Sequence, residues 1–508
     1  MSNVDALLAE IWKDPASDAP RLVLADQYEQ DGDLERANFI RLQIERANLP
    51  SWEARASALE LQERALVAKH GEAWRAHLPQ LPGVQWGSFR RGFIRAVAFD
   101  DVDNYVAHHE ECARRVPMQG VALPWPRSGT RPKLGTVSNV EELTMFGTVM
   151  EQDDMKWLAG CQVLSTIRSL NLIDSELRTG WAQLLKSKHL GALEALRLPR
   201  SHVGNAGITK LAASTTMPKL AELDLSVGAD EELGSGRGYG RRAASVTSKG
   251  ILELAAWKQL AQIHTLDVSG AKLGSEGTLM LLASQHTKAL RTLRMRDIKD
   301  SDWDMDDSLG AFKAGPAGTL DELDISRNDL DPDAAHFMAE AKALRELKVL
   351  RMAGVRSNSF GRFAQASWVR SLRVLQCDEA VLPVFLARSP EQLHTIEIGP
   401  TATSLSQVVR HLAFKPPPAL ATLDLRESRI DDEGLRKLGE LELPKLTTIK
   451  LPPTRRGFSL VGIKALAESK LGSQLVSLDA GAAEFDRLPE PDRLDVGDGD
   501  YEGPFRYL

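Results

Sequence analysis

The chain has 508 residues, of which 43% are apolar and 26% charged, with a formal net charge of −7. These shares are ordinary for a globular protein, and the acidic balance gives no general reason to expect nucleic-acid binding, which normally needs a basic face. Three widely separated cysteines exclude a disulfide framework, and no run approaches the roughly 18 apolar residues of a membrane span. The first residues lack the pattern of a secretory signal, so a cytoplasmic protein is expected.

Residues 1–82 are predicted to form a helical domain. Asp14-Pro15 and Asp31-Gly32-Asp33 separate amphipathic stretches, which indicates helix, turn, helix, turn, helix, and another amphipathic stretch covers 56–78. The region resembles the short repeat-companion domain that precedes repeat arrays in some bacteria, with Gln27 where the family usually has Trp. The resemblance implies a bacterial origin and no specific activity. It rests on Asp14, Pro15, Asp18, Pro20, Arg21, Leu22, Ala25, Asp26, Gly32, Arg36, Phe39, Ile40 and Gln43.

Three charged residues of this region, Arg21, Asp26 and Arg36, fit either a partner site or salt bridges between helices, and the salt bridges are favoured. Residues 83–139 are predicted to form a cap and transition, with a strand, a helix and a strand over 84–125, because repeat arrays need a covered end. Within this segment Arg90-Arg91 beside aromatic residues favours a solvated strand edge over nucleic-acid stacking. His108, His109 and Cys112 share a helix but lack the companions of a zinc site.

A recurrent pattern begins near residue 140. In "LDELDISRNDL" the apolar residues Leu320, Leu323 and Ile325 follow neither a helical nor a simple alternating period. The same spacing recurs thirteen times, and ten of the twelve steps between its central apolar residues span 25 to 30 residues. These central residues are Leu143, Leu170, Leu196, Leu223, Leu266, Leu293, Leu323, Leu350, Leu375, Ile396, Leu423, Ile449 and Leu478.

The pattern resembles the leucine-rich repeat family, whose strand motif is L-x-x-L-x-L. Apolar runs starting near Gly204, Ser248, Gly274 and Asp431 predict a helix in the second half of the unit. A strand-plus-helix unit of about 27 residues is similar to the ribonuclease-inhibitor type. The family's asparagine after the strand is present as Asn328, and its place is taken by Ser175, Ser201 and Ser428, whose hydroxyls could bond backbone in the turn.

The expected fold class is therefore α/β: a leucine-rich repeat solenoid over 140–480, with a curved parallel sheet and helices on the convex side, after a small helical domain. Residues 229–248 lengthen one repeat, and this glycine-rich insertion is interpreted as a mobile loop or, alternatively, as a binding loop for an acidic partner. Residues 481–508 are expected to form an acidic tail or cap. The loop candidates are Arg237, Tyr239, Arg241 and Arg242.

A column of side chains on the concave face is the leading candidate site. The residue between the two inward apolar positions of each strand must face away from the core. Acidic and basic residues interleave in this column, which suits a protein partner and argues against a phosphate backbone. Reversal of the central charges is expected to leave the fold intact. The candidate residues are Asp224, Asp267, Arg294, Asp324, Arg351, Glu397 and Asp424.

No catalytic, cofactor or metal motif stands out in the sequence, and neither a small-molecule substrate nor a membrane partner is evident. The favoured function is a non-catalytic scaffold or adaptor that binds a protein partner. The alternative is a regulator of a separately encoded enzyme, for example a GTPase-activating protein, which would need an arginine such as Arg242 or Arg327 beside the partner's nucleotide.

Overall fold

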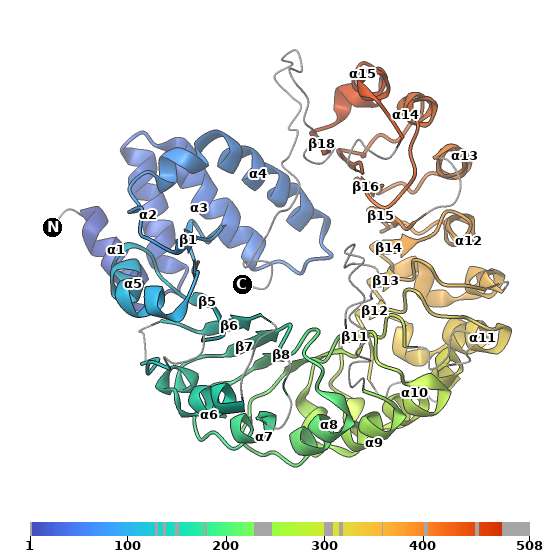
Figure 1. Ribbon diagram of the computed structural model, residues 1–508. Coiled ribbons are helices and arrows are strands. Elements are labelled where there is room, and N and C mark those ends of the chain that lie inside the picture. The colour runs from blue at the N-terminus through green and yellow to red at the C-terminus, as the bar shows by residue number, and fades with distance from the viewer. Residues whose placement is uncertain are drawn as a thin grey trace. The chain divides into compact units, whose positions relative to one another are not determined.

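The computed structural model describes residues 3–126, 131–135, 139–147, 152–175, 177, 180–227, 246–298, 308–313, 318–357, 359–400, 405–452 and 457–479. The described residues form two compact units. The first comprises residues up to Val246 together with Ala256–Asp267, and the second comprises Thr247–Ala255 together with the residues from Val268. Figure 1 labels the helices and strands of both units.

The first unit begins with four helices, as the sequence predicts: α1 (Asn3–Lys13), α2 (Ala19–Gln30), α3 (Leu34–Ala47) and α4 (Ala54–Arg75). Pro20 lies in the first turn of α2, where its missing N–H would have no helical partner. Asp33 caps α3 by accepting a hydrogen bond from the backbone N–H of Arg36. Ile11 and Leu24 are fully buried and cluster with Phe93, a residue outside the helices.

A hairpin follows the helices and packs into them. Strands β2 (Phe89–Arg90) and β3 (Phe93–Ile94) are antiparallel and enclose a two-residue turn, Arg91-Gly92. Both turn residues have positive φ, 50° and 89°, which is the signature of a type I′ turn. A Cβ at Gly92 would lie 2.5 Å from Cγ1 of Ile40, so both the backbone and the contact with α3 require glycine there.

The main sheet of the first unit starts with β1, antiparallel to β4, and continues with parallel strands from β4 to β10. The predicted strand, helix, strand order over 84–125 is confirmed, since α5 (Val102–Arg115) connects β4 to β5. The strands are β1 (Val84–Trp86), β4 (Ala96–Phe99), β5 (Gly120–Pro124), β6 (Glu142–Phe146), β7 (Ser169–Ile173), β8 (Ala195–Arg197), β9 (Glu222–Asp224) and β10 (Thr265–Asp267).

The second unit has eight parallel strands among its described residues, paired in chain order. The central apolar residues predicted from the sequence are aligned: Leu293 pairs with Leu323, Leu323 with Leu350, and so on to Leu478. The strands are β11 (Thr292–Arg294), β12 (Glu322–Asp324), β13 (Val349–Arg351), β14 (Val374–Cys377), β15 (Thr395–Ile398), β16 (Thr422–Asp424), β17 (Thr448–Lys450) and β18 (Ser477–Asp479).

Helices connect successive strands and lie together on one side of the sheet in each unit (Figure 1). Helices α8, α9 and α10 begin at Gly204, Ser248 and Gly274, as predicted, and Asp431 caps α14. The bounds are α6 (Gln152–Gly160), α7 (Trp181–Leu184), α8 (Gly204–Ala212), α9 (Ser248–Ala256), α10 (Gly274–Ala283), α11 (Pro332–Glu340), α12 (Leu382–Leu386), α13 (Ser406–Phe414), α14 (Asp432–Gly439) and α15 (Leu460–Ala467), with 3₁₀ turns at Ser308–Lys313 and Phe360–Gln365.

The core is formed by the repeating leucines. Leu320, Leu323 and Ile325 are all fully buried, so each repeat places three side chains between the sheet and the helices. Burying one such side chain stabilises the fold by about 1.5–3 kcal/mol, and each repeat achieves this only against its neighbours.

Polar side chains in the turns join adjacent repeats. Asn328 is buried; its Nδ2 donates to the carbonyls of Met295 (2.7 Å) and Ile325 (2.9 Å), and its Oδ1 accepts from the N–H of Ile298 (2.9 Å). The hydroxyls of Ser175 and Ser201 also donate to backbone carbonyls, as predicted. The prediction is wrong for Ser428, whose buried hydroxyl has no partner among the described residues.

These observations confirm the predicted fold class, an α/β leucine-rich repeat solenoid. The repeated buried leucines, the in-register parallel strands and the helices on one face are the features of that fold. Among the described residues, no helix combines the length and apolarity needed to cross a membrane.

Candidate functional site

The predicted column of polar side chains lies in register on the sheet, on the side opposite the helices, which we call the helix-free face. In the first unit Thr144, Asn171, Arg197, Asp224 and Asp267 occupy paired positions of β6 to β10. The second unit has a column of its own at the same strand position, formed by Arg294, Asp324, Arg351, Gln376, Glu397, Asp424, Lys450 and Asp479 on β11 to β18.

The column is less exposed than the sequence suggests. Asp424 is only 8% exposed, and the other candidate residues are half-buried. Neighbouring parallel strands lie only about 4.8 Å apart, so side chains in register cover one another. These residues face away from the core, as the sequence predicts, but they are not freely solvated.

The aspartates of the column have a structural role at the strand ends. Three of them accept a hydrogen bond from the backbone N–H two residues later: Asp224 from Ser226 (2.8 Å), Asp324 from Ser326 (2.9 Å) and Asp424 from Arg426 (3.1 Å). This local side-chain bond favours the turn that leaves the strand. Loss of these carboxylates would therefore affect the fold as well as any partner.

A second column, which the sequence analysis did not consider, lies beside the first. It contains the residues two positions earlier in each strand, which alternation places on the same face. In the first unit its member Glu142 is 6% exposed and lies between two arginines: Oε2 is 2.7 Å from Arg95 Nη1, and Oε1 is 3.5 Å from Arg197 Nη1. The alternation of side chains along a strand, applied to the sequence, would have predicted this column.

Arg197 extends this ionic cluster to the next strand. Its Nε and Nη2 donate to the two carboxylate oxygens of Glu222 at 2.6 and 2.9 Å, and Asn171 donates to Glu142 at 3.2 Å. Burial lowers the pKa of Arg197, but its hydrogen bond to Glu222 and the charges of Glu222 and Glu142 raise it above the ordinary value. The first unit therefore has a rigid, internally paired polar patch.

The second unit has an equivalent cluster. Glu322, 6% exposed, accepts from Arg351 Nη1 at 2.5 Å and from Arg294 Nη2 at 3.2 Å. Arg351 Nε also lies 3.9 Å from Glu397 Oε2. Burial raises the pKa of Glu397, although the charge of Arg351 opposes that shift. We call Arg294, Glu322, Arg351 and Glu397 the central lattice.

The remaining candidates fall elsewhere. Arg237, Tyr239, Arg241 and Arg242 lie outside the described residues, as does most of the predicted loop 229–248, and the tail 481–508 also lies outside them. Arg327 is a half-buried turn residue with φ 61°. Cys112 is fully buried, and burial raises the pKa of its thiol to about 12. Among the described residues no group of three or more histidine, cysteine or acidic side chains could hold a metal ion.

Two charged residues of the helical region, Arg21 and Arg36, form hydrogen bonds with the turn of the hairpin. Arg21 donates to the carbonyls of Pro15 (2.8 Å) and Arg91 (3.2 Å), and Arg36 donates to that of Gly92 (2.6 Å). The salt-bridge interpretation is therefore wrong for both arginines, because they satisfy the backbone of a tight turn. It is correct for Asp26, whose carboxylate pairs with Arg41 of the neighbouring helix at 2.5 Å.

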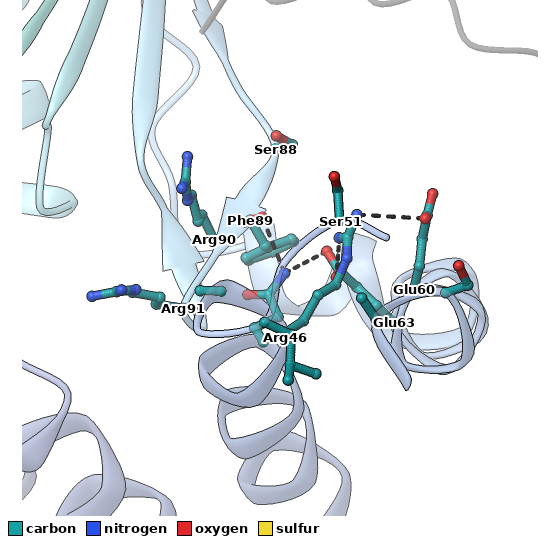
Figure 2. A pocket seen from close by; sticks show the side chains of 13 residues that line it. Arg46, Ser51, Glu60, Glu63, Ser88, Phe89, Arg90 and Arg91 are labelled. Carbon is teal, nitrogen blue, oxygen red and sulfur yellow. Dashed lines mark hydrogen bonds and ion pairs between the residues drawn. The ribbon is translucent and has the colours of Figure 1, made fainter. Parts of the chain in front are cut away.

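A cavity of about 520 Å³ lies between α3, α4 and this hairpin (Figure 2). Arg46 pairs across it with Glu63 at 2.7 Å and lies 3.6 Å from Glu60. Figure 2 shows the side chains of Arg90 and Arg91 pointing away from Arg46. Because the charges within this cavity compensate one another, it offers a weaker reason to expect a ligand than the helix-free face.

Comparison with known proteins gives no match to any family model and none to a curated protein. Among solved structures, a chain of the Rad7 and Elc1 complex of yeast is 11% identical, with 68% of this chain and 83% of that chain covered and a TM-score of 0.41. An internalin (inlF) from Listeria monocytogenes is 13% identical, with 76% of this chain and 94% of the internalin chain covered and a TM-score of 0.34. A chain of the TLR13–ssRNA13 complex is 15% identical, with 73% of this chain and 52% of that chain covered and a TM-score of 0.32. Similarity this low transfers no partner to this chain.

Proposed function

We propose that this chain is a non-catalytic recognition protein whose helix-free face binds a protein partner. The observation that supports the proposal is the central lattice: Arg294, Glu322 and Arg351 lie on the consecutive strands β11 to β13, and Arg351 reaches across β14 towards Glu397 on β15, so that the four charges hold one another in place. A pre-organised pattern of both charges favours a partner with the complementary pattern, because little side-chain entropy is lost on binding.

The mixed signs favour a protein over a nucleic acid. Glu322 and Glu397 would repel a phosphate backbone, whereas a protein surface can present both signs. The sequence suggests two functions, a scaffold that binds a protein partner and a regulator of a separately encoded enzyme. The scaffold needs only this surface. The regulatory role needs an additional reactive arginine, for which the sequence offers Arg242 or the half-buried turn residue Arg327.

We also propose four more specific features of this protein. They are the ribonuclease-inhibitor type of repeat, the repeat-companion identity of residues 1–82, the division at residues 82, 139 and 480, and the cytoplasmic location. The regular exchange of strand and helix supports the repeat type, and the run of four helices α1–α4 before the first strand supports a distinct N-terminal domain.

Inverting the charges of the central lattice tests the function. The variant combines Arg294→Glu, Glu322→Arg, Arg351→Glu and Glu397→Arg, so that each internal ion pair is rebuilt with opposite sign. The control inverts an exposed pair on the helix side, Glu433→Arg with Arg436→Glu, whose charges lie 2.7 Å apart on α14. Wild type, variant and control would be used to capture partners from native-cell extract, with circular dichroism and melting temperature as folding checks.

We expect one or more proteins to bind wild type and control but not the inverted variant. Association of the purified partner should weaken by at least about 10-fold, since several complementary charge pairs become repulsive. A partner that binds the folded, inverted protein with unchanged affinity would contradict binding through this face.

A further inference from the structure

A second cavity, of about 710 Å³, lies within the first unit between α1, α4, α5 and the hairpin. Its walls are largely apolar and aromatic, including Trp12, Trp74 and Phe93. Among the described lining residues the charged side chains are mostly basic: Arg36, Arg114 and Arg115 against one acid, Asp5. Apolar walls with a few convergent polar groups are typical of small-molecule sites.

Arg36 is the unusual member of this lining. It is 7% exposed, and its Nη2 donates to the carbonyl of Gly92, but its buried Nη1 has no hydrogen-bond partner among the described residues. No carboxylate among the described residues forms an ion pair with it; the hydroxyl of Tyr28 acts on it by charge and by a side-chain hydrogen bond, and Asp33 acts on it by charge. Its guanidinium carbon lies 4.8 Å from the ring centre of Trp74 and 5.5 Å from that of Phe93.

This environment is costly for a lone cation. Burial lowers the pKa of Arg36, with Tyr28 and Asp33 in partial opposition. Cation–π contacts with the surrounding rings offset part of the cost of desolvation, but an unpaired buried N–H remains unfavourable. A buried charge is normally paired, so an anion that reached Nη1 would supply the missing interaction.

The surrounding charges favour an anion as well. Burial and then the charge of Arg36 lower the pKa of His77, which also lines the cavity. Arg114 and Arg115 are exposed on α5, where they can attract an anion from solution. One unpaired donor in an aromatic cavity suits a single carboxylate better than a multiply charged phosphate.

We propose that this cavity binds a small monocarboxylate with an apolar or aromatic body, with the carboxylate on Arg36 and the body against Trp74, Phe93 and Trp12. The site is separate from the helix-free face, so it is independent of the proposed partner. The sequence alone indicates no such ligand, because the lining residues come from six separate segments between residues 5 and 116.

The test compares two probes of nearly equal shape, naphthalene-1-acetate and the neutral naphthalene-1-acetamide, by isothermal titration calorimetry on the full chain. The carboxylate should bind at least about 10-fold more tightly than the amide, because only it can form a charge-assisted bond with the guanidinium. Arg36→Gln should reduce this preference to about 3-fold or less, since a neutral amide replaces the cation.

Arg36 also donates a hydrogen bond to the hairpin turn, so its replacement could disturb the fold. A second variant that leaves Arg36 unchanged is therefore needed. Ala113→Trp on α5 should fill the cavity and weaken binding of both probes, whereas Ala107→Trp, on the same helix and exposed outside the lining, should not. Equal binding of amide and carboxylate by wild type would overturn the proposal. Unchanged carboxylate binding by folded Ala113→Trp would also overturn it.

Discussion

Glu322 Oε1 lies 2.5 Å from Nη1 of Arg351, one strand away on the helix-free face. The same oxygen accepts from Arg294 on the opposite neighbour, so one nearly buried acid links three consecutive strands. The pairing stabilises the repeat array and at the same time fixes the charge pattern that a partner would meet. Stability and recognition are therefore coupled at this position.

Replacing Glu322 by Gln should destabilise the protein by about 1–3 kcal/mol. The two arginines lose their shared counter-charge, and their partial exposure keeps the cost below that of a fully buried pair. The control is Glu346→Gln, whose carboxylate is 61% exposed and 3.9 Å from Arg345; its change should stay within about 0.5 kcal/mol. Urea unfolding measures both, and equal values for the two variants would contradict the structural role of Glu322.

Asn328→Ala should cost about 2–4 kcal/mol, because three backbone groups lose a buried hydrogen-bond partner. Ser428→Ala at the equivalent turn should be nearly neutral, since the hydroxyl it removes is buried without a partner among the described residues. Thermal unfolding of the two variants would reveal the difference. A loss at Ser428 as large as that at Asn328 would show that the two turns are equally hydrogen-bonded.

Gly92→Ala should destabilise the first unit by about 2–4 kcal/mol, the sum of left-handed backbone strain and overpacking against Ile40. Gly32 has nearly the same φ, 91°, but open space around its missing Cβ. Gly32→Ala should therefore cost only the backbone part, about 1–2 kcal/mol. Chemical denaturation followed by tryptophan fluorescence can compare them, and a Gly92 cost no greater than that of Gly32 would argue against the close packing of the hairpin.

Glu397 predicts a pH dependence of stability. Burial raises its pKa in the folded protein, so the folded state retains a proton that the unfolded state releases. Stability should therefore fall as pH rises from the ordinary carboxyl value, about 4.3, through the raised value. Glu397→Gln should remove this pH dependence. Above the raised pKa of Glu397, the variant should therefore lose less stability than wild type does.

Urea titrations from pH 4 to pH 7 would measure the effect. Glu442→Gln, at a carboxylate that is 82% exposed, serves as the control and should retain the pH dependence of wild type. If Glu397→Gln showed the same pH dependence as wild type, the buried carboxylate would not be its source.

The sequence by itself determined the repeat architecture. The thirteen apolar positions from Leu143 to Leu478 lie in thirteen strands, and helices α8, α9 and α10 begin where the glycine or serine signals indicate. Such prediction succeeds because each repeat is a local unit whose pattern recurs, so a single periodicity specifies both the strand and its buried face.

Only the tertiary structure decided what the polar residues do. Arg36 seemed suited to a salt bridge, yet it contacts the carbonyl of Gly92, which lies 56 residues later. Glu142 and Arg197 are 55 residues apart and meet because the long side chain of Arg197 on β8 reaches across β7 to Glu142 on β6. A charged side chain can pair with any of many opposite charges or carbonyls, and its own sequence neighbourhood does not select among them. That choice is made by packing and desolvation, which exist only once distant segments have been brought together.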